Sequence, residues 1–151
     1  MYEVIPLEGI GPILLGMSRA ESRSAMGIQP DTFRKGVDSP TLTDAYDNQG
    51  FHVYFDDDER VEYIEIFPSR MSAVYKGVPV FQTKADELVA IITKDSHYDN
   101  DDPELGFSYV FPELELSLWR PIIPESEDDG EYEYFSSLGI GKKGYYNRDA
   151  V

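Results

Sequence analysis

The residues best suited to chemistry are two histidines, several runs of carboxylates and one glycine pattern near the C-terminus. Gly139, Gly141 and Gly144 match the spacing of the dinucleotide-binding fingerprint. That chemistry requires a following helix whose N-terminus receives the pyrophosphate, and an acid about twenty residues further on. Only seven residues follow Gly144. We therefore expect a turn at this pattern and no nucleotide cofactor.

Metal binding would need His, Asp or Glu side chains that converge on one point. His52 and His97 are the two histidines of the chain, too few for a typical zinc site. The acidic runs at residues 56–59 and 99–104 lack the alternating ligands, central glycine and terminal glutamate of a calcium loop. We expect no metal centre, and a weak calcium site in the second run is the alternative left open.

Covalent or acid–base catalysis finds little support in the residue types. The chain has no cysteine and no Gly-x-Ser-x-Gly nucleophile motif. Carboxylates are abundant, but a glycosidase needs one pair across a cleft with one raised pKa, and no spacing selects such a pair. The prediction is a protein that is not an enzyme, with a hydrolase using paired carboxylates as the alternative.

The charge balance limits the partners. The chain has 29 acidic and 13 basic residues and a net charge of −16. Nucleic acids and anionic membranes are disfavoured because binding them requires cationic groups, whereas a basic protein would be attracted. The N-terminal residues have no basic segment followed by a long apolar run. We expect a cytoplasmic protein, monomeric or weakly dimeric.

Surface recognition is the function that remains. Acidic runs at 56–59, 99–104 and 125–133 alternate with aromatic residues, and aromatic anchors beside charge are typical of protein interfaces. A scaffold module that self-associates by strand addition is a further alternative. The predicted binding residues are Tyr98, Asp99, Asp101, Asp102, Trp119, Glu127, Asp128, Asp129 and Tyr132.

The first half predicts a short strand region at residues 3–17, a helix and a hairpin. Ser18 and Glu21 form a capping-box pattern at the helix start, and Gly27 suits a left-handed C-terminal stop. Residues 51–55 and 61–67 then alternate with period two around a polar turn, which predicts a β-hairpin. The expected inner face of the helix is Met17, Ala20, Ser24, Ala25 and Ile28.

The second half predicts another helix and hairpin. Thr83 is the expected N-cap, with Asp86 at the third position, and the helix should end near Thr93. Strands are expected at 106–111 and 114–118, and a further strand at Tyr134 and Phe135.

Residues 50–55 and 106–111 resemble each other, and each lies after a helix and before a polar turn. Two diverged helix-plus-antiparallel-hairpin units, 1–70 and 71–151, would follow from this likeness. The predicted fold is a single α+β domain over 1–151, with helices packed on one face of a mainly antiparallel sheet.

Residues 13–21, Ile-Leu-Leu-Gly-Met-Ser-Arg-Ala-Glu, carry a resemblance to known families. They are similar to the Leu-Gly-Met-Ser opening of the helix-plus-sheet modules in beta-lactamase inhibitory protein and in the outer-membrane assembly lipoprotein BamE. The resemblance implies a two-unit protein that binds an enzyme across its sheet. The second unit lacks the Leu-Gly-Met element, and the missing lipoprotein cysteine argues against the role of BamE.

Two broader likenesses point the same way. The segments at 9–17 and 117–121 and the glycines near residue 140 look like those of a family of small bacterial proteins. In size, acidity and lack of a catalytic motif, the chain is also similar to the immunity proteins of bacterial toxin systems. We therefore expect an immunity or inhibitory protein whose acidic surface occludes a basic toxin or enzyme.

Overall fold

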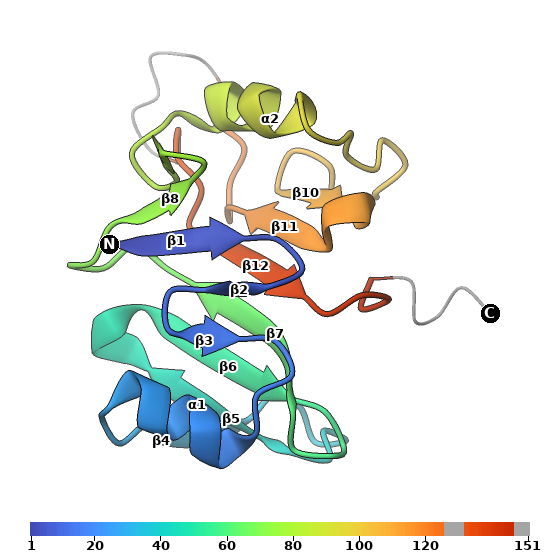
Figure 1. Ribbon diagram of the computed structural model, residues 1–151. Coiled ribbons are helices and arrows are strands. Elements are labelled where there is room, and N and C mark those ends of the chain that lie inside the picture. The colour runs from blue at the N-terminus through green and yellow to red at the C-terminus, as the bar shows by residue number, and fades with distance from the viewer. Residues whose placement is uncertain (126–131, 147–151) are drawn as a thin grey trace.

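Antiparallel strands make up most of the protein, which has mixed α and β content (Figure 1). The computed structural model describes residues 1–125 and 132–146. Within these residues the strands form one sheet of seven and one of five, and two α-helices accompany them. The α+β class expected from the sequence is confirmed, with sheets more extensive than two hairpins would give.

The seven-stranded sheet is antiparallel throughout and joins the two halves of the chain. β12 pairs with β7 at its centre, so a strand from each half lies side by side. Its order is β10 (Ser108–Phe111), β11 (Leu116–Trp119), β12 (Ser137–Gly141), β7 (Val61–Ile66), β6 (Phe51–Phe55), β5 (Leu42–Tyr46) and β4 (Asp31–Arg34).

The five-stranded sheet is built from shorter strands. Its central pair, β1 with β8, is parallel and again links the two halves of the chain. Its order is β3 (Ile13–Leu14), β2 (Gly9–Ile10), β1 (Tyr2–Ile5), β8 (Ala73–Tyr75) and β9 (Val78–Pro79).

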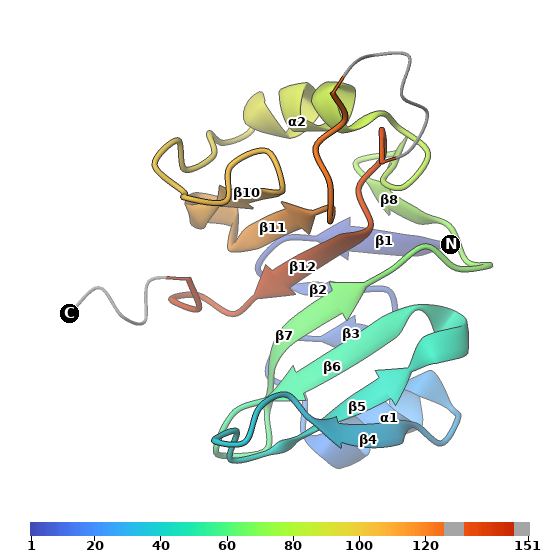
Figure 2. The same cartoon turned by 180° about the vertical axis from the view of Figure 1, so that it is seen from behind.

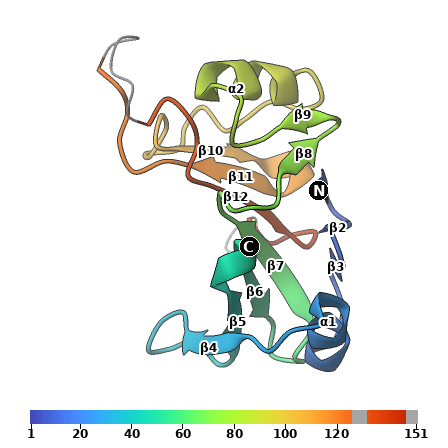
Figure 3. The ribbon, with the colours of Figure 1, turned by 90° about the vertical axis from the view of Figure 1, so that its left-hand side faces the viewer.

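Both helices and the smaller sheet cover the same face of the seven-stranded sheet, as the edge-on view shows (Figure 3). We call this the inner face. Alternate residues of β6, β11 and β12 point to it and form part of the core, for example Phe51, Val53 and Phe55 of β6. The opposite, outer face is seen from behind in Figure 2, where strands β1 to β3 lie at the back.

Helix α1 (Arg19–Met26) begins as the sequence predicts. Ser18 Oγ accepts a hydrogen bond from the Glu21 amide, the Glu21 carboxylate accepts one from the Ser18 amide, and Gly27 ends the helix with a φ of 73°. The predicted inner face is wrong at Ala20, Ser24, Ala25 and Ile28, which are exposed, and correct at Met17, which packs against the core. The helix turns Arg19, Ser22, Arg23 and Met26 toward the sheet instead.

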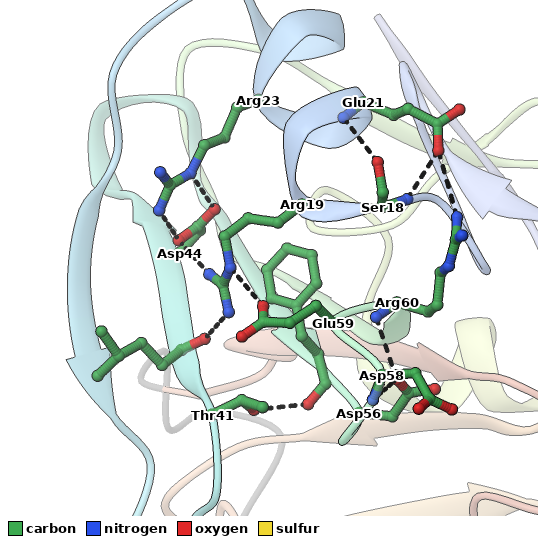
Figure 4. Close-up of polar contacts among 12 residues, drawn as sticks. Ser18, Arg19, Glu21, Arg23, Thr41, Asp44, Asp56, Asp58, Glu59 and Arg60 are labelled. Carbon is green, nitrogen blue, oxygen red and sulfur yellow. Dashed lines mark hydrogen bonds and ion pairs between the residues drawn. The ribbon is translucent and has the colours of Figure 1, made fainter.

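The reason is a buried carboxylate beneath the helix. Asp44 of β5 points to the inner face with a fully buried side chain, and it accepts hydrogen bonds from Arg19 at 2.7 Å and from Arg23 at 2.8 and 2.9 Å (Figure 4). The Arg19 guanidinium also lies 3.9 Å from the centre of the Phe55 ring. Charge pairing therefore fixes α1 on the sheet where an apolar stripe would ordinarily do so.

Helix α2 (Ala85–Thr93) ends at the predicted residue and buries Leu88 and Ile92. The N-cap prediction is wrong: Lys84 occupies that position and no side chain caps the helix. Thr83 instead donates its hydroxyl hydrogen bond back to the Pro79 carbonyl at 2.6 Å. This local bond to the preceding chain competes with capping.

Each half of the chain places a 3-10 turn before a strand. η1 (Asp47–Gln49) ends at Gly50 with φ 73°, and η2 (Pro112–Leu114) ends at Glu115 with φ 49°. The predicted hairpin of β6 and β7 is confirmed, and so is that of β10 and β11. However, β6 follows its 3-10 turn and β10 precedes one, so residues 50–55 and 106–111 do not hold equivalent places.

The glycine pattern near the C-terminus is not the predicted turn. Gly139 and Gly141 lie within the buried strand β12, and only Gly144, at φ 88°, lies in a turn. Tyr134 and Phe135 do not form the expected strand, since β12 begins at Ser137. Glycine is required at 139 because a Cβ there would lie 1.8 Å from the Tyr63 hydroxyl oxygen on the neighbouring strand.

Candidate functional site

One end of the seven-stranded sheet gathers exposed apolar side chains. Three neighbouring strands meet at this end of the sheet: β10 starts there, β11 ends there and β12 starts there. Ser108 pairs with Trp119, and Trp119 pairs with Ser137. The described chain has fifteen exposed large apolar residues. Six of them lie within five positions in the sequence of Ser108, Trp119 or Ser137. We call them the apolar end: Phe107, Trp119, Ile122, Ile123, Tyr132 and Tyr134.

The exposure of these side chains is substantial. Trp119 is 42% exposed and Ile122 48% exposed. Scattered exposed apolar residues are normal on protein surfaces, but a concentration at one place marks an interaction site. The single tryptophan of the chain therefore lies where a partner could bury it.

Arg120 organises this end of the molecule from within. Its side chain is only 5% exposed, and its Nε and Nη1 donate to the carbonyls of Gly106 and Tyr132 at 2.9 and 3.2 Å. Its backbone amide donates to the Phe107 carbonyl at 2.9 Å, and its guanidinium lies 5.5 Å from the Phe135 ring centre. One buried cation thus ties together the three segments that display the apolar end.

A cleft of about 650 Å³ opens beside Arg120, between this end of the sheet and the first turn of α2. Tyr109 and Ile123 supply apolar walls, and Glu133 and residues 84–87 supply charge of both signs. Burial raises the pKa of Tyr109 above its usual value, and Arg120 partly opposes this shift. The cleft is therefore mixed in character.

The acidic loop after α2 borders the apolar end on one side. The Asp99 amide donates to the Val110 carbonyl at 2.8 Å, so the loop runs along the outer edge of β10. The carboxylates of Asp99 and Asp102 each accept a backbone hydrogen bond from two residues further on, at 2.9 Å. These carboxylates are consequently held in a fixed arrangement in the loop beside β10.

The predicted binding residues divide into four groups. Trp119 and Tyr132 lie at the apolar end, and Asp99, Asp101 and Asp102 lie in the bordering loop. Tyr98 instead packs its ring edge-on against Tyr109, at 5.2 Å, and against Phe111 in the core. Glu127, Asp128 and Asp129 lie outside the described residues.

Sequence reasoning missed Phe107, Ile122, Ile123 and Tyr134. Each is a large apolar residue close to a strand, so each looks like a core position in the sequence. The proline residues that flank Ile122 and Ile123 were the available signal, because they exclude a central strand there.

Other chemistry leaves few traces in the described residues. No group of three or more His, Asp or Glu side chains there could hold a metal ion, and neither helix is long and apolar enough to cross a membrane. The resolved shifts of carboxyl pKa values are downward, at Glu21, Asp56 and Asp95. A carboxylic acid catalyst would require a shift in the opposite direction.

For Asp56 the downward shift is the outcome of opposing effects. Burial pushes its pKa up, but hydrogen bonds from the Arg60 amide, the Lys142 ammonium and the Asp58 amide together hold it below the usual value. The carboxylate is therefore stabilised in its charged form as part of a turn.

Comparisons of this chain with protein-family models, with curated proteins and with solved structures find no match.

Proposed function

We propose that this protein is an immunity or inhibitory protein, which occludes a basic toxin or enzyme with its apolar end. The observation that carries the proposal is the gathering of six exposed apolar residues at one edge of the sheet. Protein interfaces place aromatic anchors at their centre and polar residues at their rim. Trp119 and Tyr132 are the central anchors, and the acidic loop at residues 99–104 forms part of the rim.

The charge of the chain supports a basic partner. A net charge of −16 attracts a cationic protein over distances longer than any contact. Because rim charges act chiefly on the rate of association, the attraction should weaken as salt screens it. The apolar anchors should then determine how long the complex lasts.

The proposal extends to the origin of the fold. We infer that the two halves are diverged copies of one helix-plus-hairpin unit, supported by the 3-10 turns η1 and η2, each followed by a residue with positive φ. In this alignment Gly50 corresponds to Glu115, and β6 corresponds to β11. The apolar end would then belong to the second unit alone, which gives the two copies different tasks.

The test is co-expression with the basic protein encoded by the neighbouring gene, followed by calorimetry of the complex at several salt concentrations. We expect a one-to-one complex whose affinity falls as salt increases. Trp119→Ala should weaken binding by about 30-fold, as loss of a hot-spot residue does. Failure to bind any basic neighbour, or binding insensitive to salt, would contradict the proposal.

A matched pair of variants separates the apolar end from general surface effects. Ile122→Ser changes a residue of the apolar end that is 48% exposed, and Ile28→Ser changes one after α1 that is 43% exposed. Binding should weaken only in the first variant. Equal effects of both substitutions would remove the apolar end from the interface.

A further inference from the structure

The cleft beside Arg120 is a feature distinct from the exposed side chains of the apolar end. It lies between the first turn of α2 and the strands β10 and β11, which run beneath that helix (Figure 1). Its volume of about 650 Å³ falls within the range of about 300–1,000 Å³ that is usual for small-molecule sites. The size of the cleft therefore permits a ligand larger than a single ion.

The apolar walls of the cleft are held in place by the protein itself. The Tyr109 ring packs edge-on against Tyr98 at 5.2 Å and against Phe135 at 5.7 Å. Gly106 has a φ of 101°, and a Cβ there would lie 2.6 Å from Ile123 Cδ1, so glycine leaves room for this side chain. Tyr109 and Ile123 are thus preformed apolar surfaces that a ligand could contact.

Arg120 brings a buried positive charge to the cleft. It donates hydrogen bonds to two neutral carbonyls, whereas the buried Asp44 carboxylate is the counter-ion of Arg19 and Arg23. No carboxylate of residues 1–125 or 132–146 forms an ion pair with Arg120. Buried arginines are ordinarily paired with an anion. A carboxylate on a ligand would supply the missing negative charge.

Carboxylates line the same cleft. The carbonyl of Glu133 accepts a hydrogen bond from the first amide of α2 at 2.8 Å, and its carboxylate lies 4.0 Å from Lys84 Nζ, at the outer limit of an ion pair. Burial is the main cause of the raised pKa of Tyr109, but Asp86 adds to the shift and Arg120 opposes it. Charges of both signs therefore act on one phenol, which shows that they lie close together in the cleft.

We propose that this cleft binds a free α-amino acid with a large apolar side chain. The carboxylate of the ligand pairs with Arg120 and Lys84, and its ammonium group pairs with Glu133 and Asp86. Its side chain packs on the preformed apolar walls. The proposal is independent of the proposed function, because it requires no protein partner at the apolar end.

The presence of both charges decides the class of ligand. A simple anion would be attracted by Arg120 but repelled by the carboxylates of Asp86 and Glu133. A simple cation would be repelled by Arg120, whose guanidinium does not lose its proton. A zwitterion offers each set of charges its opposite at once, and an analogue that lacks either group leaves one set without a partner.

The first test titrates the full chain with L-phenylalanine while two amide resonances are followed by NMR. Gly106 lines the cleft, and Gly36 lies in the loop after β4, at the opposite end of the molecule (Figure 1). We expect saturable shifts at Gly106 and none at Gly36.

Two analogues are the matched ligands: 3-phenylpropanoate lacks the ammonium group, and phenethylamine lacks the carboxylate. Each should bind at least tenfold more weakly than L-phenylalanine, because each leaves charges of the cleft without a partner. Absence of a saturable shift at Gly106 with L-phenylalanine, or equal affinity for either analogue, would overturn the proposal.

A second test uses a substitution at the cleft. Arg120 is a poor target, because its loss would also release the segments that it ties together. The side chains of Lys84 and Lys76 are 57% and 66% exposed, and each lies near one carboxylate, but only Lys84 lines the cleft. Lys84→Met should weaken the binding of L-phenylalanine by about tenfold, whereas Lys76→Met should leave it unchanged. Equal affinities of the two variants would contradict the assignment of the ligand to this cleft.

Discussion

Replacing Asp44 with asparagine should remove the charge that fixes helix α1 to the sheet. The Asp44 carboxylate is completely buried and is the shared partner of Arg19 and Arg23 (Figure 4). Asparagine keeps the shape of the side chain but accepts through one oxygen only, and its amide group would face two guanidinium groups. Arg23 would then lose its ion-pair partner near the inner face, whereas Arg19 would keep its pair with Glu59 at 2.6 Å.

The magnitude follows from burial. Removing one partner of a buried ion pair typically costs about 3–5 kcal/mol. The side chains of Arg19 and Arg23 are 18% and 35% exposed, so they can turn partly toward water. We therefore expect the lower end, about 3 kcal/mol, which corresponds to a fall in Tm of about 10 °C for a domain of this size.

The assay is urea denaturation followed by far-UV circular dichroism, with the free energy of unfolding obtained by linear extrapolation. The matched control is Arg60→Gln, which removes an exposed ion pair of 3.4 Å with Glu21 and should leave stability unchanged. A loss below about 1 kcal/mol for Asp44→Asn, or a loss equal to that of the control, would refute the view that charge pairing fixes α1.

Two further predictions concern the centre of the outer face. Gly139→Ala places a Cβ against the Tyr63 hydroxyl and should destabilise the protein by about 1–3 kcal/mol. The control Gly36→Ala should not destabilise it, because no atom lies within 4 Å of the added Cβ. Equal urea midpoints of the two variants would contradict this prediction. Burial raises the pKa of Tyr63 to about 12, with hydrogen bonds from Ser117 and Tyr146 opposing the shift. Because the unfolded phenol ionises near pH 10, Tyr63 contributes stability that is fully present below pH 10 and is lost between pH 10 and about 12, roughly 3 kcal/mol in total. Melting temperatures across that range should fall less for Tyr63→Phe than for the wild type, and parallel curves would disprove the assignment.

Local sequence determined the elements whose signals lie within a few residues of one another. The β6–β7 hairpin follows from alternation, because one face of each strand is buried. The start of α1 follows from Ser18 and Glu21, whose capping bonds span one turn. The hairpin of β10 and β11 follows from alternation too, as the β6–β7 hairpin does.

Tertiary structure decided whatever depends on residues far apart in the chain. The inner face of α1 could not be inferred, since Arg23 and Asp44 are 21 residues apart and their pairing replaces the expected apolar stripe. β12 was hidden because glycine carries no strand signal, and only the Tyr63 ring on the neighbouring strand requires glycine at 139.

The candidate site shows the same division. Composition gave the surplus of negative charge and the aromatic residues, and hence the expectation of a basic protein partner. It could not say that Ile122 and Phe107 are exposed, because their exposure depends on the place where the start of β10, the end of β11 and the start of β12 meet. An apolar residue has the same local signature in a core and at an interface, and only the packing around it distinguishes the two.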